Sequence, residues 1–110
     1  MENREGFKKV MFFAKKRFKE TMPKSLEVRR VKSKKVKQFG FPPSVLTSKP
    51  IAQYIVFVDY YEEFRVFFFS NSGDSLGGKN YDKPSDIKKE IAKKSKLIKR
   101  FPRKSSPYAL

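Results

Sequence analysis

One long apolar segment, residues 54–70, constrains the fold of this chain more than any other feature. β-branched and aromatic side chains dominate it, as they do in pleated and largely buried strands. Polarity rises at residues 59–63, where a short turn fits, so the pattern predicts two antiparallel strands, 53–59 and 63–70, joined as a hairpin. The second strand is apolar on both of its faces. It must therefore be covered on both faces or offer one of them to a partner.

The remaining segments alternate between helical and extended patterns. Apolar residues recur at helical spacing in residues 3–21 and again in 85–100, and a lysine-rich stripe lies opposite each of them. Residues 25–31 alternate weakly and predict an edge strand. The composition of residues 40–50 and 71–84 predicts loops. The expected fold class is therefore α+β, with a small antiparallel sheet built on a central hairpin and flanked by an N-terminal and a C-terminal helix.

The length and composition set further expectations. A chain of 110 residues is expected to form a single domain, 1–110, with a short basic mobile tail at 102–110. Without cysteine it has no disulfide and no thiolate metal site, and no cofactor is expected. Neither a membrane-spanning apolar run nor the apolar core of a secretory signal is present. We expect a cytoplasmic, nucleoid or nuclear protein that is neither secreted nor transmembrane.

The chain is strongly basic, and its positive charge lies outside the hairpin. There are 27 Lys and Arg against 11 Asp and Glu, a formal net charge of +16. Residues 1–50 hold 15 basic and 4 acidic side chains, residues 51–80 hold 2 and 4, and residues 81–110 hold 10 and 3. Such an excess repels itself, and a polyanionic partner would relieve the repulsion. Nucleic acid is the commonest partner of this kind.

The favoured hypothesis is a non-enzymatic protein that binds DNA or RNA through the phosphate backbone, largely independently of sequence. Lysine outnumbers arginine, and lysine acts as a point charge towards phosphate, whereas arginine makes the bidentate contacts that read bases. Stacking on unpaired bases is expected from Phe12, Tyr60 and Tyr61. Phosphate contacts are expected from both helices and from the 29–37 run: Lys8, Lys15, Lys16, Lys19, Arg29, Arg30, Lys32, Lys34, Lys35, Lys37, Lys88, Lys89, Lys93, Lys96, Lys99 and Arg100.

Other partners use the same charge and stay open as alternatives. A small inhibitor could dock on an acidic protein surface or occupy a nucleic-acid channel, with an aromatic residue as its anchor. Phe12 could pack against a second subunit, which leaves a homodimer open. The first helix could lie on anionic lipid, although a membrane is the less favoured partner.

Two motifs in the glycine-rich segment 73–80 resemble enzyme signatures. Residues 73–77 match the G-x-S-x-G pattern of the α/β-hydrolases, but the chain has no histidine to activate the serine. Residues 73–80 resemble a P-loop, except that Asn80 replaces the hydroxyl that would hold Mg²⁺. The alternative interpretation of both is a glycine-rich turn.

A third motif lies at the tip of the hairpin. Glu63-Phe-Arg65, preceded by Asp59, resembles the Glu-x-Lys step of the PD-(D/E)xK nucleases. The resemblance implies that Asp59 and Glu63 converge on one Mg²⁺ in a metal-dependent nuclease. The alternative is a polar turn that keeps a hydrophobic hairpin soluble, with no metal site.

Overall fold

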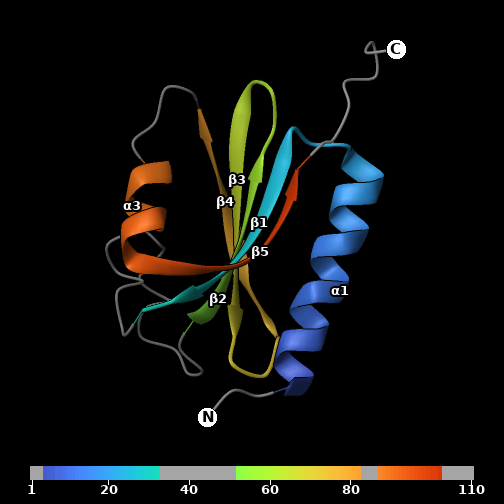
Figure 1. Cartoon of the computed structure of the whole chain (residues 1–110), viewed down its shortest axis with the longest axis vertical. Helices are drawn as coiled ribbons and strands as arrows, with labels where there is room; N and C mark the ends of the chain where they lie inside the picture. Colours follow the sequence, from blue (N-terminus) through green and yellow to red (C-terminus); the bar gives the residue numbers. More distant parts are fainter. Residues whose placement is uncertain (1–3, 33–51, 83–86, 103–110) are drawn as a thin grey trace.

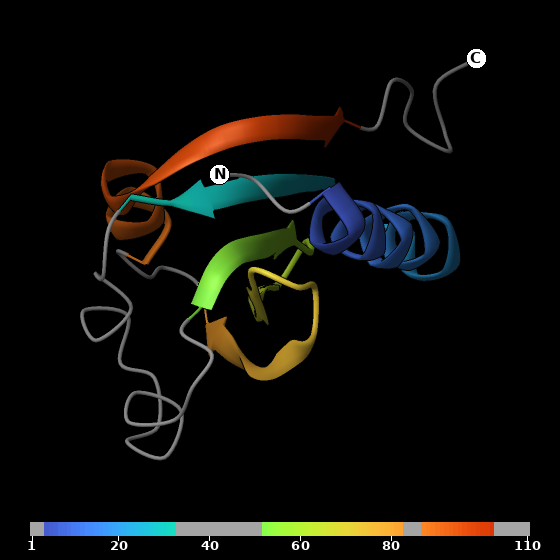
Figure 2. The ribbon, with the colours of Figure 1, turned by 90° about the horizontal axis from the view of Figure 1, so that it is seen from below.

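The predicted hairpin forms the middle of a five-stranded antiparallel sheet that has one helix on each face (Figures 1 and 2). The computed structural model describes residues 4–32, 52–82 and 87–102. In chain order the elements are α1 (Arg4–Thr21), β1 (Ser25–Val31), β2 (Ala52–Asp59), β3 (Glu63–Ser70), β4 (Ser75–Asp82), α3 (Ile87–Lys94) and β5 (Ser95–Pro102). The strands lie in the order β4-β3-β2-β1-β5. The α+β class, the hairpin and the two flanking helices are confirmed.

Two apolar clusters lie on the two faces of the sheet. On one face, Val10 of α1 is buried in a cluster with residues of β1 and β2. On the other face, Ile87 and Ile91 of α3 are buried with residues of β2 and β3. β3 contributes Phe69 to the first cluster and Phe68 to the second. The strand that is apolar on both faces is therefore covered on both faces by the chain itself.

α1 begins and ends close to the predicted limits, 3–21, and its amphipathic pattern explains its place. The buried stripe includes Val10 and Ala14, whereas the lysines at 8, 9, 15, 16 and 19 are exposed. Phe12 is the exception on the outer face, where 70% of it is exposed. Within the described ranges, no helix has the length and apolar character needed to cross a membrane.

The predicted helix at 85–100 is wrong beyond Lys94. Ser95 is buried, and its hydroxyl donates to the carbonyl of Ile91, a side-chain bond to the backbone that competes with helix continuation. From Ser95 the chain runs as β5, which pairs antiparallel with β1. The segment 25–31, predicted as an edge strand, is therefore an interior strand between β2 and β5.

The loop predicted at 71–84 is wrong for residues 75–82, which form β4. The glycine-rich and polar composition of β4 is unfavourable for a strand, but pairing along β3 satisfies its backbone and overrides that preference. β4 is an outer strand, and most of its residues are exposed. Residues 40–50 and 103–110, predicted as a loop and as the main part of a mobile tail, lie outside the described residues.

The first turn of α1 lies against the turn between β3 and β4. Gly6 is buried there, and a Cβ on it would lie 1.9 Å from the carbonyl oxygen of Asn71. In the same turn, Gly73 has a φ of +85°, and a Cβ on it would lie 2.7 Å from the Gly6 carbonyl oxygen. Two residues without side chains thus allow the helix to approach the turn.

Gly6→Ala is expected to lower the free energy of unfolding by about 1–3 kcal/mol, because the added methyl group overlaps the backbone of the turn. Inside a helix without that contact, the same change would stabilise by about 1 kcal/mol, so the sign of the effect is diagnostic. Urea denaturation measures it, with Glu5→Ala at the neighbouring exposed position as the control. An unchanged or raised stability of Gly6→Ala would contradict this helix position.

Candidate nucleic-acid interface

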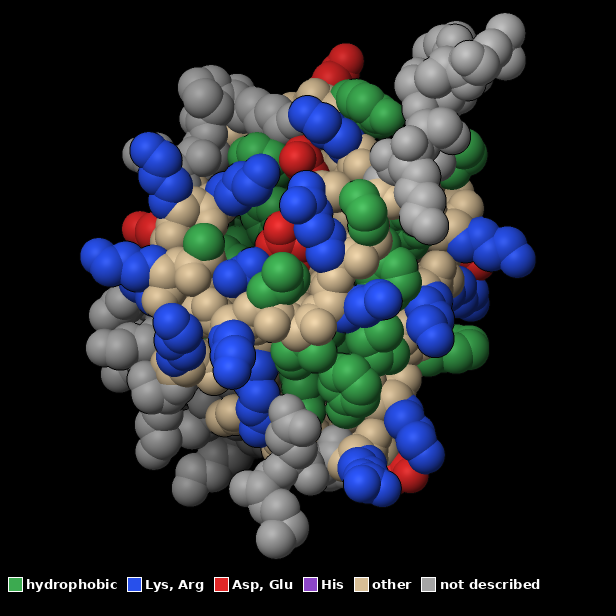
Figure 3. Space-filling view, viewed as in Figure 1, with side chains coloured by type: hydrophobic (Ala, Val, Ile, Leu, Met, Phe, Trp, Pro, Cys, Tyr) green, Lys and Arg blue, Asp and Glu red, His purple; other side chains and the backbone are tan. Residues whose placement is uncertain are grey.

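Six exposed basic residues follow one another along α3 and β5. They are Lys88, Lys89, Lys93, Lys96, Lys99 and Arg100, and we call this surface the basic edge because β5 is an outer strand of the sheet. Figure 3 shows Lys and Arg side chains spread over this side of the molecule, with fewer acidic side chains between them. None of the six forms an ion pair with another residue in the described ranges.

The acidic residue within α3 does not neutralise this surface. Glu90 is half-buried, and its carboxylate pairs with Lys94 at 3.8 Å. It also faces Tyr81 of β4: the pKa of the Tyr81 hydroxyl is raised above its ordinary value of 10.0, first by burial and second by the charge of Glu90. Glu90 is thus directed towards β4 and Lys94, and the basic edge keeps its positive charge.

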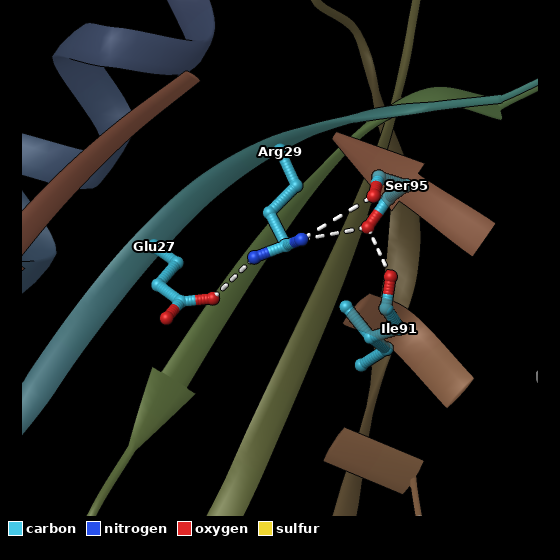
Figure 4. A network of polar contacts seen from close by, with 4 residues as sticks. All are labelled: Glu27, Arg29, Ile91 and Ser95. Carbon is cyan, nitrogen blue, oxygen red and sulfur yellow. Dashed lines mark hydrogen bonds and ion pairs between the residues drawn. The ribbon is translucent and has the colours of Figure 1, made fainter. Parts of the chain in front are cut away.

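A buried polar network holds the corner between α3 and β5 (Figure 4). Arg29 donates from Nε to the hydroxyl of Ser95 at 2.7 Å and from Nη2 to the Ser95 carbonyl at 3.3 Å. Its Nη1 pairs with a carboxylate oxygen of Glu27 at 2.8 Å. Ser95 in turn donates to the carbonyl of Ile91. Arg29 was predicted as a phosphate contact, but it is only 8% exposed and its guanidinium is directed into this network.

Of the rest of the predicted 29–37 run, the structure describes only residues 30–32. The guanidinium of Arg30 lies 4.8 Å from the centroid of the Tyr54 ring, and its Nη2 donates to the Asn71 side chain at 3.3 Å. Both neighbours belong to the side of the sheet that α1 covers, so Arg30 is held inward rather than towards a base. Lys32 is exposed. Lys34, Lys35 and Lys37 lie outside the described residues.

The lysines of α1 divide into two groups. Lys8 lies 3.8 Å from Glu5, and Lys9 lies 3.9 Å from Asp74, so these two cations have nearby carboxylates. The other group, which we call the α1 patch, consists of Phe12, Lys15, Lys16 and Lys19. These residues line a shallow hollow of about 600 Å³ together with the acidic Glu20. α1 and α3 lie on opposite faces of the sheet (Figure 2), so the two helices do not form one clamp.

The two tyrosines predicted to stack have different surroundings. The Tyr60 hydroxyl donates to Thr21 Oγ1 at 2.9 Å, and the guanidinium of Arg65 lies 5.7 Å from the ring centroid. Tyr60 therefore ties the tip of the hairpin to the end of α1. Tyr61 is 60% exposed and, like Phe12, presents its ring to solvent.

The carboxylates of the nuclease hypothesis are not brought together. Asp59 pairs with Phe64 across the hairpin, so these two side chains share one face of the sheet and the neighbouring Glu63 faces the other. Glu63 instead pairs with Arg65 at 3.5 Å. No group of three or more His, Cys, Asp or Glu suited to a metal ion occurs in the described part of the chain. The P-loop resemblance also lacks its helix, because the glycine-rich segment leads into β4.

A cleft opens next to the basic edge, at the end of the sheet that holds the hairpin tip. Its volume is about 460 Å³. The register brings its walls together, because Ser25 lies opposite Asp59 on one side and opposite Pro102 on the other. The amide of Lys24 donates to the Asp59 carbonyl at 2.8 Å. The lining residues are Lys24, Ser25, Asp59, Tyr61, Lys88, Arg100 and Pro102.

No pattern in the sequence predicts this cleft, and Lys24 and Ser25 are not among the predicted site residues. The lining residues come from four distant parts of the chain, and no local pattern indicates that they meet. Asp59 was predicted as a metal ligand, but it lies in a cleft whose other charged residues are basic. The signal that could have found the cleft is the pairing of β1 with both β2 and β5, which needs β5 to be recognised as a strand.

The chain matches no family model, and comparisons with curated proteins and with solved structures found no similar protein. The fold and surface define an α+β protein with a basic sheet edge and an adjacent charged cleft. Its function is therefore inferred from the geometry and charge of these two features.

Ser95→Ala is expected to lower the free energy of unfolding by about 1–3 kcal/mol, because it leaves the buried Arg29 guanidinium without a hydrogen-bond partner at Nε. Chemical denaturation measures the loss. Hydrogen exchange of the Lys32 amide, which donates to the Lys94 carbonyl at 2.9 Å, should become faster because the corner loosens. Ser75→Ala, at an exposed position of β4, is the control. If both variants unfold alike, the network does not hold this corner.

Proposed function

We propose that this chain is a nucleic-acid-binding protein without enzymatic chemistry of its own, and that the basic edge holds the phosphate backbone. The observation that supports this proposal is the set of six exposed cations without an ion-pair partner among the described residues. Cations that are not neutralised internally can replace the counterions condensed on a nucleic acid. The release of those counterions supplies most of the free energy of non-specific binding.

A sheet edge can carry lysine for another reason, because charge on an outer strand prevents pairing with the edge of another molecule. That reason applies to Lys96, Lys99 and Arg100 of β5. It does not apply to Lys88, Lys89 and Lys93, which lie on a helix and have no open backbone edge to protect. The continuation of the positive surface from β5 onto α3 therefore favours a polyanionic ligand.

The composition of the basic edge favours contacts that do not depend on base sequence. Five of its six members are lysines, which bind phosphate as point charges. Arg29 and Arg30, the two arginines of β1 among the predicted phosphate contacts, are held by Ser95 and Tyr54 instead. Only Arg100 remains on this surface with the bidentate geometry that reads guanine. Binding should therefore discriminate little between sequences.

The affinity for nucleic acid is expected to fall steeply with salt. About six neutralised phosphates give a slope of log K against log salt of about −4 for single strands and about −5.5 for duplex DNA. Lys93→Gln combined with Lys96→Gln should make this slope shallower by about 1.5 and weaken binding similarly on every sequence. Fluorescence anisotropy with mixed-sequence RNA, single-stranded DNA and duplex DNA, from roughly 50 to 200 mM salt, measures both effects.

Lys8→Gln combined with Lys9→Gln is the matched control, because it removes the same charge from lysines that already lie near Glu5 and Asp74. The control should leave the slope close to that of the unaltered protein. If both double variants weaken binding equally, net charge is responsible and not the basic edge. Affinity that does not change with salt would exclude the proposed function.

A further inference from the structure

We propose that the cleft beside the basic edge binds the phosphate monoester of a nucleotide. This inference deepens the proposed function and rests on it, because it assigns to the cleft the phosphorylated end of a strand that lies on the basic edge. The shared chemistry is that of a nucleoside monophosphate, whether the nucleotide is free or terminates a strand. The cleft volume of about 460 Å³ lies within the range of about 300–1,000 Å³ that is usual for small-ligand sites.

The charge of the lining fits a terminal phosphate better than a backbone phosphate. Among the described lining residues, Lys24, Lys88 and Arg100 accompany one carboxylate, that of Asp59, so this part of the lining has a formal charge of +2. A phosphodiester in the backbone carries one negative charge. A phosphate monoester carries about −1.5 to −2 near neutral pH and offers three acceptor oxygens. The cleft thus has the charge and the donors for a monoester.

The remaining lining residues suit the other parts of a nucleotide. Tyr61 is 60% exposed and lines the cleft, so its ring is accessible to a base for stacking. Asp59 is 5% exposed and can accept a hydrogen bond from a sugar hydroxyl or a base amino group. The Ser25 hydroxyl can donate or accept beside it, since the two residues are paired in the sheet. A cleft for a simple inorganic anion would not need an aromatic ring or a buried carboxylate.

The cleft is continuous with the basic edge. Lys88 begins the cations of α3, Arg100 ends those of β5, and both also line the cleft. A strand whose backbone lies along the basic edge can therefore place its last phosphate in the cleft without leaving the protein. Lys24 and Tyr61 line the cleft but do not belong to the basic edge, so they allow the two sites to be tested separately.

The direct test compares one short RNA, labelled internally, in three forms: with a 5′-phosphate, with a 3′-phosphate, or with hydroxyls at both ends. Anisotropy should show about tenfold tighter binding of one phosphorylated form, the effect of one net charge-assisted hydrogen bond. Lys24→Gln should reduce that preference to near one, because it removes a cation that the terminal phosphate contacts. Tyr61→Ala should instead weaken the binding of all three forms, because the terminal base loses its stacking partner in each of them. Lys8→Gln, at the far end of α1, removes the same charge as Lys24→Gln and should leave the preference intact.

Competition with AMP, adenosine and inorganic phosphate tests which parts of the nucleotide the cleft recognises. AMP should displace the phosphorylated RNA at lower concentration than either of the others. Inorganic phosphate as effective as AMP would overturn the nucleotide assignment. Because Lys24 and Tyr61 are both exposed, their variants should keep the melting temperature of the unaltered protein.

The experiments distinguish a wrong assignment of the cleft from a wrong assignment of the basic edge. If hydroxyl-ended RNA binds as tightly as both phosphorylated forms, with a steep salt response, the cleft assignment is overturned and the proposed function stands. If AMP binds through Lys24 and Tyr61 but neither RNA nor DNA binds, the cleft is a site for free nucleotide and the proposed function fails. If AMP, RNA and DNA all fail to bind, both proposals are wrong.

Discussion

The pairing of β5 with β1 is the interaction on which the rest of this structure depends. Without β5, β1 would have an open edge, and the chain after α3 would have no fixed position. With it, the sheet gains its fifth strand, and the cations that follow α3 are placed along a rigid outer edge. The same pairing brings Pro102 and Arg100 next to the end of β2 and so forms one wall of the cleft. The fold and the candidate site therefore both depend on the pairing of β5 with β1.

Arg29, which was expected on the surface, fixes this pairing at Ser95, the first residue of β5. Arg29 donates three hydrogen bonds, one to Glu27 and two to the hydroxyl and the carbonyl of Ser95, in a site with little access to water. A buried guanidinium is costly unless its donors are satisfied, so the network specifies one arrangement of α3, β1 and β5. The hydrogen bonds that define this corner offset the free energy that it costs to bury the charge. The corner also determines where the exposed lysines that follow it on β5 lie.

The local parts of the fold could be predicted from the sequence. The hairpin follows from its apolar alternation and its polar tip, and α1 from one stripe of apolar residues, because both signals lie within a few adjacent residues. β5 could not be recognised in the same way. Ile87, Ile91 and Ile98 are spaced as on a helix, and what ends the helix is the buried hydroxyl of Ser95, whose burial depends on β1. β4 was missed because its composition opposes a strand and only the free edge of β3 favours it.

In the candidate site too, local sequence patterns predict some features, and contacts between distant segments determine the others. The cations of α3 and β5 were predicted correctly as exposed residues. Those of α3 lie on a helix as predicted, whereas those of β5 were placed on the helix and lie on a strand, since lysine outside an apolar stripe is exposed in either structure. The cleft could not be predicted, because Lys24, Asp59 and Arg100 meet only through strand register.

Repulsion between the cations of the basic edge connects the fold with the candidate site. Lys93 and Lys96 lie on either side of the corner that Arg29 and Ser95 hold, so a buried network fixes where these cations lie, with no ion pair among the described residues. Repulsion of this kind lowers the stability of the free protein and is relieved when an anion binds. Binding to the folded state then raises stability in proportion to the logarithm of ligand concentration over Kd. A surface that only needed to remain soluble would gain nothing from this arrangement, because interspersed acidic residues would serve solubility without the repulsion.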